Sequence, residues 1–202
     1  MALPTAVRDR LAELILAALS DADARRALAS LAAAGGADAP EGAQPSRFES
    51  PGEWDVHAAG AAAGAAIAER ARRAWGAIAQ RAVDPRGAGL DRALDQAAAL
   101  FDAGLYFEVH ELLEPHWIAA GGHTRRTLQG LIQIAVGFEH LADGNAQGAR
   151  SLLRSGSTRV AGGDRLGREL RAFARAVEAC ADRLDAGARA SDVKAPRFPA
   201  TV

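Results

Sequence analysis

The sequence predicts an all-α protein, a compact multi-helix bundle of antiparallel helical hairpins with an N-terminal helical extension. Alanine is the commonest residue type, aromatic residues make up only 5% of the chain, and no segment alternates apolar and polar residues as a half-buried strand would. Alanine has the highest helix propensity, and its small side chain lets helices pack closely. With 202 residues, 49% of them hydrophobic, the chain can bury a substantial core.

The first part of the chain is expected to be an extension of that core. Residues 1–34 are predicted to form a helical hairpin, because Ser20 or Asp21 can cap its second helix. Residues 35–50 are rich in glycine and proline and are expected to be a flexible linker. Residues 51–84 begin with a capping box and continue as a long Ala-rich helix.

The core bundle is predicted over residues 88–190, followed by a surface tail over residues 191–202. Glycine-rich turns separate its helices, which are expected at residues 90–103, 105–119, 124–142, 146–156 and 162–186. Gly104 and Gly144 each precede a small or apolar residue by five positions and a leucine by nine. This spacing is similar to that of tetratricopeptide-type helix pairs, although two units are too few for a solenoid.

The segment from Phe101 to Trp117 carries the clearest functional signal, because it places ionisable groups within an apolar helix. At about 100° per residue, His110 and Glu114 fall in a gap between apolar side chains, and Glu111 lies just beyond. Charged groups in such a gap are costly to bury unless they are paired, hydrogen-bonded or bound to a metal. The sequence of this segment therefore predicts a functional site.

The helix expected at residues 124–142 carries a second polar stripe. Gln129, Gln133 and His140 lie within about 60° of one another around the helix axis. Because a short loop makes this helix an antiparallel neighbour of the preceding one, the two stripes are expected to meet in a shared pocket or network. The candidate ligand-site residues are Tyr106, His110, Glu111, Glu114, Trp117, Arg126, Gln129, Gln133 and His140.

A divalent metal is the candidate cofactor. The sequence from His110 to Glu114 is HExxE, which lacks the second histidine of the HExxH zinc motif. One histidine and one or two carboxylates from this helix, together with His140, could form a mononuclear site. The candidate metal ligands are therefore His110, Glu114 and His140.

Three kinds of function are compatible with these residues. The preferred one is binding of a small ligand or a metal in the polar site between the helices at 105–119 and 124–142. The first alternative is a non-catalytic interaction or scaffold module whose polar stripe is a structural hydrogen-bond network. The second is a metal-dependent or acid–base enzyme of the hydrolase type, with His110 as the candidate base.

The charge pattern argues against nucleic-acid and membrane partners. The net charge is −1, and arginines alternate with acids instead of clustering. No apolar run reaches the length of a membrane helix, the first residues lack a signal-peptide pattern, and Cys180 is the only cysteine. We therefore expect a cytoplasmic protein that binds a small molecule or a protein partner, with a homodimer as the candidate assembly.

Two segments resemble a known family. FDAGLYFEVHELLEPHW, from Phe101 to Trp117, and LQGLIQIAVGFEHLADGNAQGARSLL, from Leu128 to Leu153, are similar to the prokaryotic family named domain of unknown function 309. The shared motif is Tyr-Phe-Glu-x-His-Glu-x-x-Glu-x-x-Trp, here starting at Tyr106, followed by a Gln-Gly-Leu-Ile-Gln helix. The resemblance covers about residues 93–160 and implies a compact all-helical bundle. It implies no activity.

Overall fold

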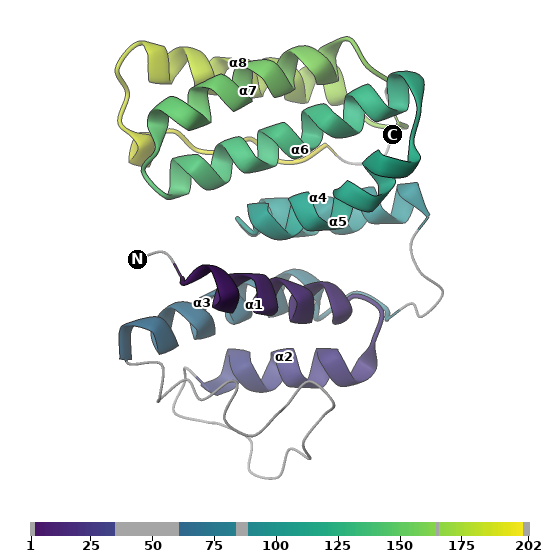
Figure 1. The fold of residues 1–202 in the computed structure, drawn as a ribbon, viewed down its shortest axis with the longest axis vertical. Coiled ribbons are helices and arrows are strands. Elements are labelled where there is room, and N and C mark those ends of the chain that lie inside the picture. Colours follow the sequence, from purple (N-terminus) through teal and green to yellow (C-terminus); the bar gives the residue numbers. More distant parts are fainter. Residues whose placement is uncertain (1–2, 35–60, 84–88, 165, 200–202) are drawn as a thin grey trace. The chain divides into compact units, whose positions relative to one another are not determined.

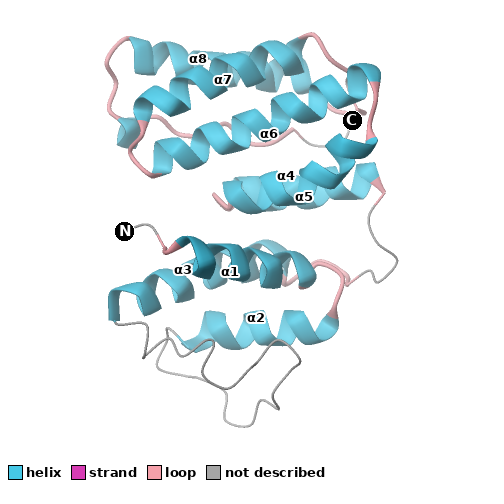
Figure 2. Ribbon diagram, viewed as in Figure 1, coloured by secondary structure: helices cyan, strands magenta, loops and turns pink. Residues whose placement is uncertain are grey.

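The computed structural model describes residues 3–34, 61–83, 89–164 and 166–199 (Figure 1). Contacts divide the chain into two units, Met1–Ala88 and Gly89–Val202, and each is described by itself. Every regular element in the described ranges is a helix, which confirms the all-α fold class (Figure 2). None of these helices combines the length and hydrophobicity needed to span a bilayer.

The first unit contains three helices, α1 (Thr5–Ala17), α2 (Ala22–Ala34) and α3 (Ala61–Ile78). Asp21 caps α2, because its Oδ1 accepts hydrogen bonds from the backbone N–H groups of Asp23 (2.8 Å) and Ala24 (2.9 Å). Apolar side chains of all three helices are fully enclosed, among them Leu11, Ile15, Leu28 and Ile78. The predicted linker and the capping box of the predicted long helix lie outside the described residues.

The second unit carries the candidate site residues. Its elements are α4 (Leu90–Asp102), α5 (Tyr106–Ala119), α6 (Gly122–Ala142), α7 (Ala146–Ala161), α8 (Leu170–Asp185) and the short 3-10 helix η1 (Ala190–Asp192). Short turns join successive helices, and α6 packs between α5 and α7 while α7 packs on α8 (Figure 1). After η1 the chain continues without regular structure to residue 199; we call residues 193–199 the tail. The tail inserts the buried side chains of Val193 and Phe198.

The aromatic centre of this unit is Phe101, at the end of α4. Its ring packs edge-on against Tyr106, Phe138, Phe173 and Phe198, with centroid separations between 5.1 and 5.7 Å. These four rings come from α5, α6, α8 and the tail, so one side chain contacts four different parts of the chain. Edge-to-face aromatic pairs add about 0.5–1.5 kcal/mol each beyond the burial of their surface.

Helix α7 extends to Ala161, beyond the end expected at residue 156. Gly156, which suggests a helix end in the sequence, instead lies inside α7 where this helix crosses Gly130 of α6. A Cβ atom added to either glycine would lie 2.8 Å from the carbonyl oxygen of the other. The absence of side chains at both positions therefore allows α6 and α7 to pack closely.

Helix α8 begins at Leu170, later than the expected start at residue 162. Leu166 and Gly167 have φ angles of 49° and 65°, in the left-handed region that a right-handed helix cannot contain. The next residue, Arg168, has a side chain that is only 2% exposed. Its Nη1 donates a hydrogen bond to the carbonyl oxygen of Pro199 (3.0 Å), and its Nη2 pairs with the Asp95 carboxylate. Arg168 thereby links the tail to α4.

Candidate functional site

A cavity of about 230 Å³ lies between α5 and α6. Three of the residues that line it come from α5 and three from α6; they are His110, Glu114, Trp117, Gln129, Ile132 and Gln133. Five of these six are candidate ligand-site residues of the sequence, and four of them belong to the polar stripes, so the two helices bring part of each stripe to one place.

Two buried polar atoms in this lining have no hydrogen-bond partner among the residues that the structure describes. They are Nε1 of Trp117, which can only donate, and Oε1 of Gln133, which can only accept. A buried polar atom without a partner costs about 1–3 kcal/mol, and such atoms are few in native proteins. The cavity thus presents one unpaired donor and one unpaired acceptor.

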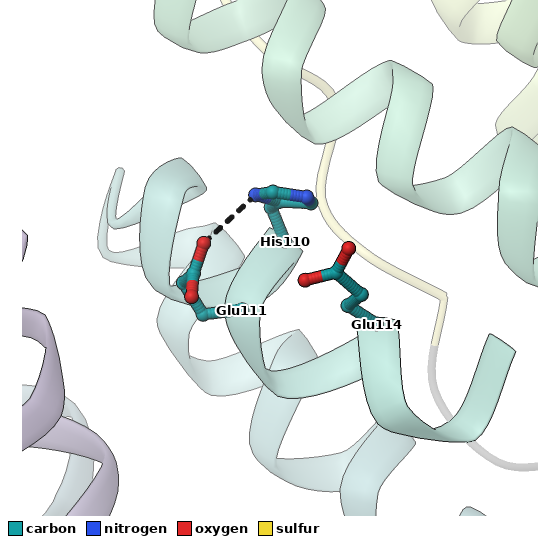
Figure 3. A group of neighbouring side chains, drawn as sticks. All are labelled: His110, Glu111 and Glu114. Atoms are coloured by element: carbon teal, nitrogen blue, oxygen red, sulfur yellow. Dashed lines mark ion pairs between the residues drawn. The ribbon is translucent and has the colours of Figure 1, made fainter. Parts of the chain in front are cut away.

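His110 lies between two carboxylates of its own helix (Figure 3). Its Nδ1 is 3.1 Å from Oε1 of Glu111, and Glu114 lies on the other side of the ring. A carboxylate on Nδ1 orients the imidazole and leaves Nε2 as the nitrogen available to a ligand. The side chains of His110 and Glu111 are 28% and 38% exposed, so this pair lies where solvent can enter.

The three side chains of Figure 3 could together hold a metal ion. His110, Glu111 and Glu114 each offer one ligand atom, and these atoms lie within 4.8 Å of one another. The described residues form no other group of three histidine, cysteine or acidic side chains as close as this. One imidazole nitrogen and two carboxylate oxygens suit Zn²⁺ and other divalent first-row metals.

His140, predicted as a metal ligand, does not belong to this group. It lies near the C-terminal end of α6, where its Nδ1 is 3.3 Å from Nδ2 of Asn145. The third donor beside His110 and Glu114 is Glu111 of α5, so all three members of the group come from one helix.

Two other predicted site residues also lie away from the cavity. Tyr106 packs its ring against Phe101 (5.1 Å between centroids) and Phe138 (5.6 Å), and it lines a second, larger cavity. Arg126 extends toward the end of α7, where a Cβ atom added to Gly162 would lie 3.8 Å from its Nη2. Neither residue lines the cavity between α5 and α6.

Arg125, next to the predicted Arg126, positions Trp117. Its Nη1 donates to the carbonyl oxygens of Trp117 (3.2 Å) and Ile118 (3.1 Å) at the C-terminal end of α5. Its guanidinium carbon lies 4.6 Å from the centre of the Trp117 ring, a cation–π distance. The sequence signal is an arginine shortly after a helix end, where unpaired carbonyl groups attract cations.

Arg159 of α7 orients Gln129, which lines the cavity on the α6 side. Its Nε donates a hydrogen bond to Oε1 of Gln129 (3.3 Å), which orients that amide. The contact joins residues 30 positions apart, so helical periodicity within α6 could not reveal it.

Glu108 is the most deeply buried acid of α5, with no exposed surface. It occupies the first turn of the helix, where the helix dipole stabilises a negative charge. Its position, three residues after the N-cap Leu105, is the glutamate position of a capping box. Glu108 does not line the cavity, which indicates a structural role.

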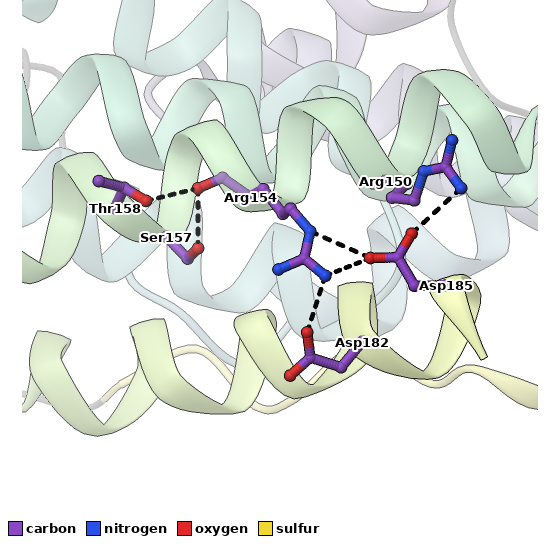
Figure 4. A network of polar contacts seen from close by, with 6 residues as sticks. All are labelled: Arg150, Arg154, Ser157, Thr158, Asp182 and Asp185. Carbon is purple, nitrogen blue, oxygen red and sulfur yellow. Dashed lines mark hydrogen bonds and ion pairs between the residues drawn. The ribbon is translucent and has the colours of Figure 1, made fainter.

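A separate group of charged residues joins α7 to α8 (Figure 4). Arg154 pairs with Asp182 (2.8 Å) and with Asp185, and Arg150 pairs with Asp185 (3.1 Å). Hydrogen bonding from Arg154 lowers the pKa of Asp185, and the two aspartates raise the pKa of Arg154. These side chains are largely exposed, which is typical of a solvated network between helices and not of a binding site.

The fold and the cavity define an all-α protein with a small polar pocket between two antiparallel helices. Residues 94–152, from α4 to α7, match the family described as Domain of unknown function (DUF309). The matched part contains both helices of the pocket, so this part of the chain is similar to that family. No curated protein and no solved structure matches the chain.

Proposed function

We propose that the cavity between α5 and α6 binds a small polar molecule. The observation that carries the proposal is the pair of buried, unpartnered atoms, Trp117 Nε1 and Gln133 Oε1, in the lining of one cavity. A ligand with an acceptor for the indole N–H and a donor for the amide oxygen would satisfy both. It would remove a cost of about 1–3 kcal/mol for each atom, which is a direct source of affinity.

The size and charge of the cavity narrow the class of ligand. Its volume of about 230 Å³ lies below the range of roughly 300–1,000 Å³ that is usual for drug-sized ligands, so the ligand is small. Glu114 lines the cavity, and Glu111 lies beside His110. Two carboxylates against one imidazole favour a ligand that is neutral or positively charged, such as a small amine or amidine.

A divalent metal is the second candidate. The close approach of His110, Glu111 and Glu114 supports it, and two of these residues also line the cavity. In this case the metal would occupy the mouth of the cavity, and a metal-bound water would become a candidate nucleophile for hydrolysis. The small-ligand proposal ranks first because the two orphaned atoms are enclosed and need a partner, whereas His110 already has one in Glu111.

The test uses two substitutions that remove the orphaned atoms. Trp117→Phe removes the indole N–H together with part of the ring, whereas Gln133→Met removes the amide oxygen and keeps the length of the side chain. If the cavity binds a ligand, both substitutions should weaken its binding. Without ligand, Gln133→Met should be as stable as the parent or more stable by up to about 1 kcal/mol, because a buried unpaired atom is gone. Trp117→Phe should be less stable than the parent, because the smaller ring loses packing.

Binding is measured by ligand-observed NMR against small amines, amidines and polyols. A hit on the parent should lose at least about tenfold in affinity in each variant, equivalent to about 1.4 kcal/mol. Gln147→Met, at an exposed position of α7, is the matched control and should bind like the parent. Destabilisation of Gln133→Met without any hit would contradict the proposal and favour a structural polar network.

Metal binding is tested in parallel by elemental analysis and by calorimetric titration with Zn²⁺ and Mn²⁺. The double variant His110→Ala/Glu114→Gln should lose stoichiometric metal while it remains folded. Binding that survives in this variant would rule out a site at His110 and Glu114.

A further inference from the structure

A second cavity, of about 700 Å³, lies in the same unit and shares no lining residue with the first. Its lining includes the aromatic residues Phe101, Tyr106 and Phe138 and, from the tail, residues 193–197. Its volume falls within the range of roughly 300–1,000 Å³ that is usual for sites of small organic ligands. Phe101 and Phe138 are each 2% exposed, so the partly exposed ring of Tyr106 is the main aromatic surface open to a ligand.

The tail places two positive charges at this cavity. Lys194, which is the only lysine of the chain, and Arg197 both line it, and both are exposed. Within the part of the chain that the structure describes, neither side chain makes an ion pair or a hydrogen bond. Two cations without counter-charges are therefore available to a ligand at the cavity rim.

The single acidic residue of the lining does not neutralise them. Oδ1 of Asp102 accepts a hydrogen bond from the backbone N–H of Phe198 (2.8 Å), so Asp102 holds the tail in place. The lining thus carries two positive charges against one negative charge.

The ends of two helices also border this cavity, and their carbonyl groups are already paired. The Phe101 oxygen, at the end of α4, accepts from the N–H of Gly104 (2.9 Å). The Leu141 oxygen, at the end of α6, accepts from the N–H of Gly144 (3.1 Å). These two carbonyl groups are therefore not free to bind a cation.

We propose that this second cavity binds an amphipathic organic anion, a molecule with a flat apolar body and a carboxylate, sulfonate or phosphate group. The body would lie against the ring of Tyr106, and the anionic group would pair with Lys194 and Arg197. The proposal does not depend on the function of the first cavity, because different residues carry it.

The test uses anilinonaphthalene sulfonate, a fluorescent aromatic anion, and phenylnaphthylamine, its neutral analogue, with the full-length protein. The sulfonate should bind one site per chain with saturation. The double variant Lys194→Gln/Arg197→Gln should weaken its binding by about tenfold, since both charges that pair with the sulfonate are lost. The neutral analogue should change by less than about threefold.

Two further variants control for nonspecific effects. Arg171→Gln/Arg175→Gln removes two exposed charges of α8 that do not line the cavity, and it should leave the sulfonate affinity unchanged. Ala142→Phe, at an exposed lining position, should block binding of both probes by occupying space. Circular dichroism checks that all variants retain the fold.

Competition experiments test the ligand class directly. Naphthoate should displace the sulfonate, and the neutral naphthamide should be about tenfold weaker, the factor expected for loss of the charged group. Equal displacement by both compounds would overturn the proposed anion recognition. Loss of affinity in the α8 control equal to that in the tail variant, or no saturable binding to the parent, would overturn the proposed site.

Discussion

Substitution of Gly130 by alanine tests whether the close crossing of α6 and α7 holds the second unit together. A Cβ atom at this position would lie 2.8 Å from the Gly156 carbonyl oxygen, 2.8 Å from Cγ2 of Val160 and 2.9 Å from Cβ of Arg159. All three distances are below normal contact. Two of the three atoms cannot rotate away, because they belong to the backbone or are fixed directly to it, so the helices themselves must separate.

The expected magnitude is the difference between two terms. Extra atoms in a well-packed interior cost about 1–3 kcal/mol, and the rigid neighbours place this site in the upper part of that range. Alanine gains about 1 kcal/mol over glycine in helix propensity. The net loss should therefore be about 1–2 kcal/mol. With a urea m-value of about 1.5 kcal/mol/M, the unfolding midpoint should fall by roughly 1 M.

Urea unfolding followed by circular dichroism measures this shift, and hydrogen exchange locates it in α6 and α7. Gly137→Ala is the matched comparison, because its Cβ would mainly meet Cδ2 (2.9 Å) and Cγ (3.0 Å) of Leu153, which belong to a side chain that can rotate. It should cost less than Gly130→Ala. Gly76→Ala, on α3 with no atom within 4 Å, should stabilise the first unit by about 0.5–1 kcal/mol. A Gly130→Ala protein as stable as the parent would refute the argument.

Three further predictions concern the tail and the charged residues. Arg168→Met should destabilise the second unit by about 1–3 kcal/mol and increase proteolysis of the tail, because the link to Asp95 is lost. Burial raises the pKa of the Cys180 thiol, so a maleimide should modify the native protein at least about tenfold more slowly than the urea-unfolded chain. Arg154 lowers the folded-state pKa of Asp185, so this contact stabilises the protein above the ordinary value of 3.8 and is lost as the pH falls below it. In Arg154→Gln, an NMR titration should find the Asp185 pKa closer to 3.8, and an unchanged value would exclude Arg154 as the cause.

The sequence predicted the helices well where local backbone chemistry determines their ends. Gly104 and Gly144 have φ angles of 71° and 79°, which favour glycine, and each lies in a turn between two helices as expected. The prediction was wrong at Gly156, because a glycine inside a helix and a glycine at its end look alike in one sequence. Only the approach of Gly130, 26 positions earlier, distinguishes them.

The contacts of Arg168 could not be predicted from the sequence for a different reason. The buried Arg168 bonds to Pro199 and Asp95, which lie 31 and 73 positions away. Periodicity within a helix contains no information about such distant partners, and an arginine between two helices is usually exposed. The tetratricopeptide-like spacing remains a prediction, since the helix packing described above neither requires nor excludes it.

Some candidate residues border the cavity between α5 and α6 and others, such as His140, do not, and this has a simple geometric reason. Helical periodicity identifies the side of a helix on which a residue lies. It does not identify which residues of the neighbouring helix lie at the same height along the axis. Gln133 and His140 share one side of α6, yet seven residues at 1.5 Å each separate them by about 10 Å. The level follows from the antiparallel pairing with α5. The rings of Tyr106 and Phe138 are 5.6 Å apart, so Phe138 lies opposite the first residue of α5.

His140 lies two residues beyond Phe138 and therefore beyond the start of α5. Trp117 and Gln129, at the other end of the hairpin, border the same cavity, as a short loop requires. The loop length thus determines which part of the α6 stripe can meet His110. Gln133 lies at a height along the helix axis that is within reach of His110, and His140 does not. The stripe, the loop length and the pairing of Tyr106 with Phe138 together indicate which stripe residues border the cavity.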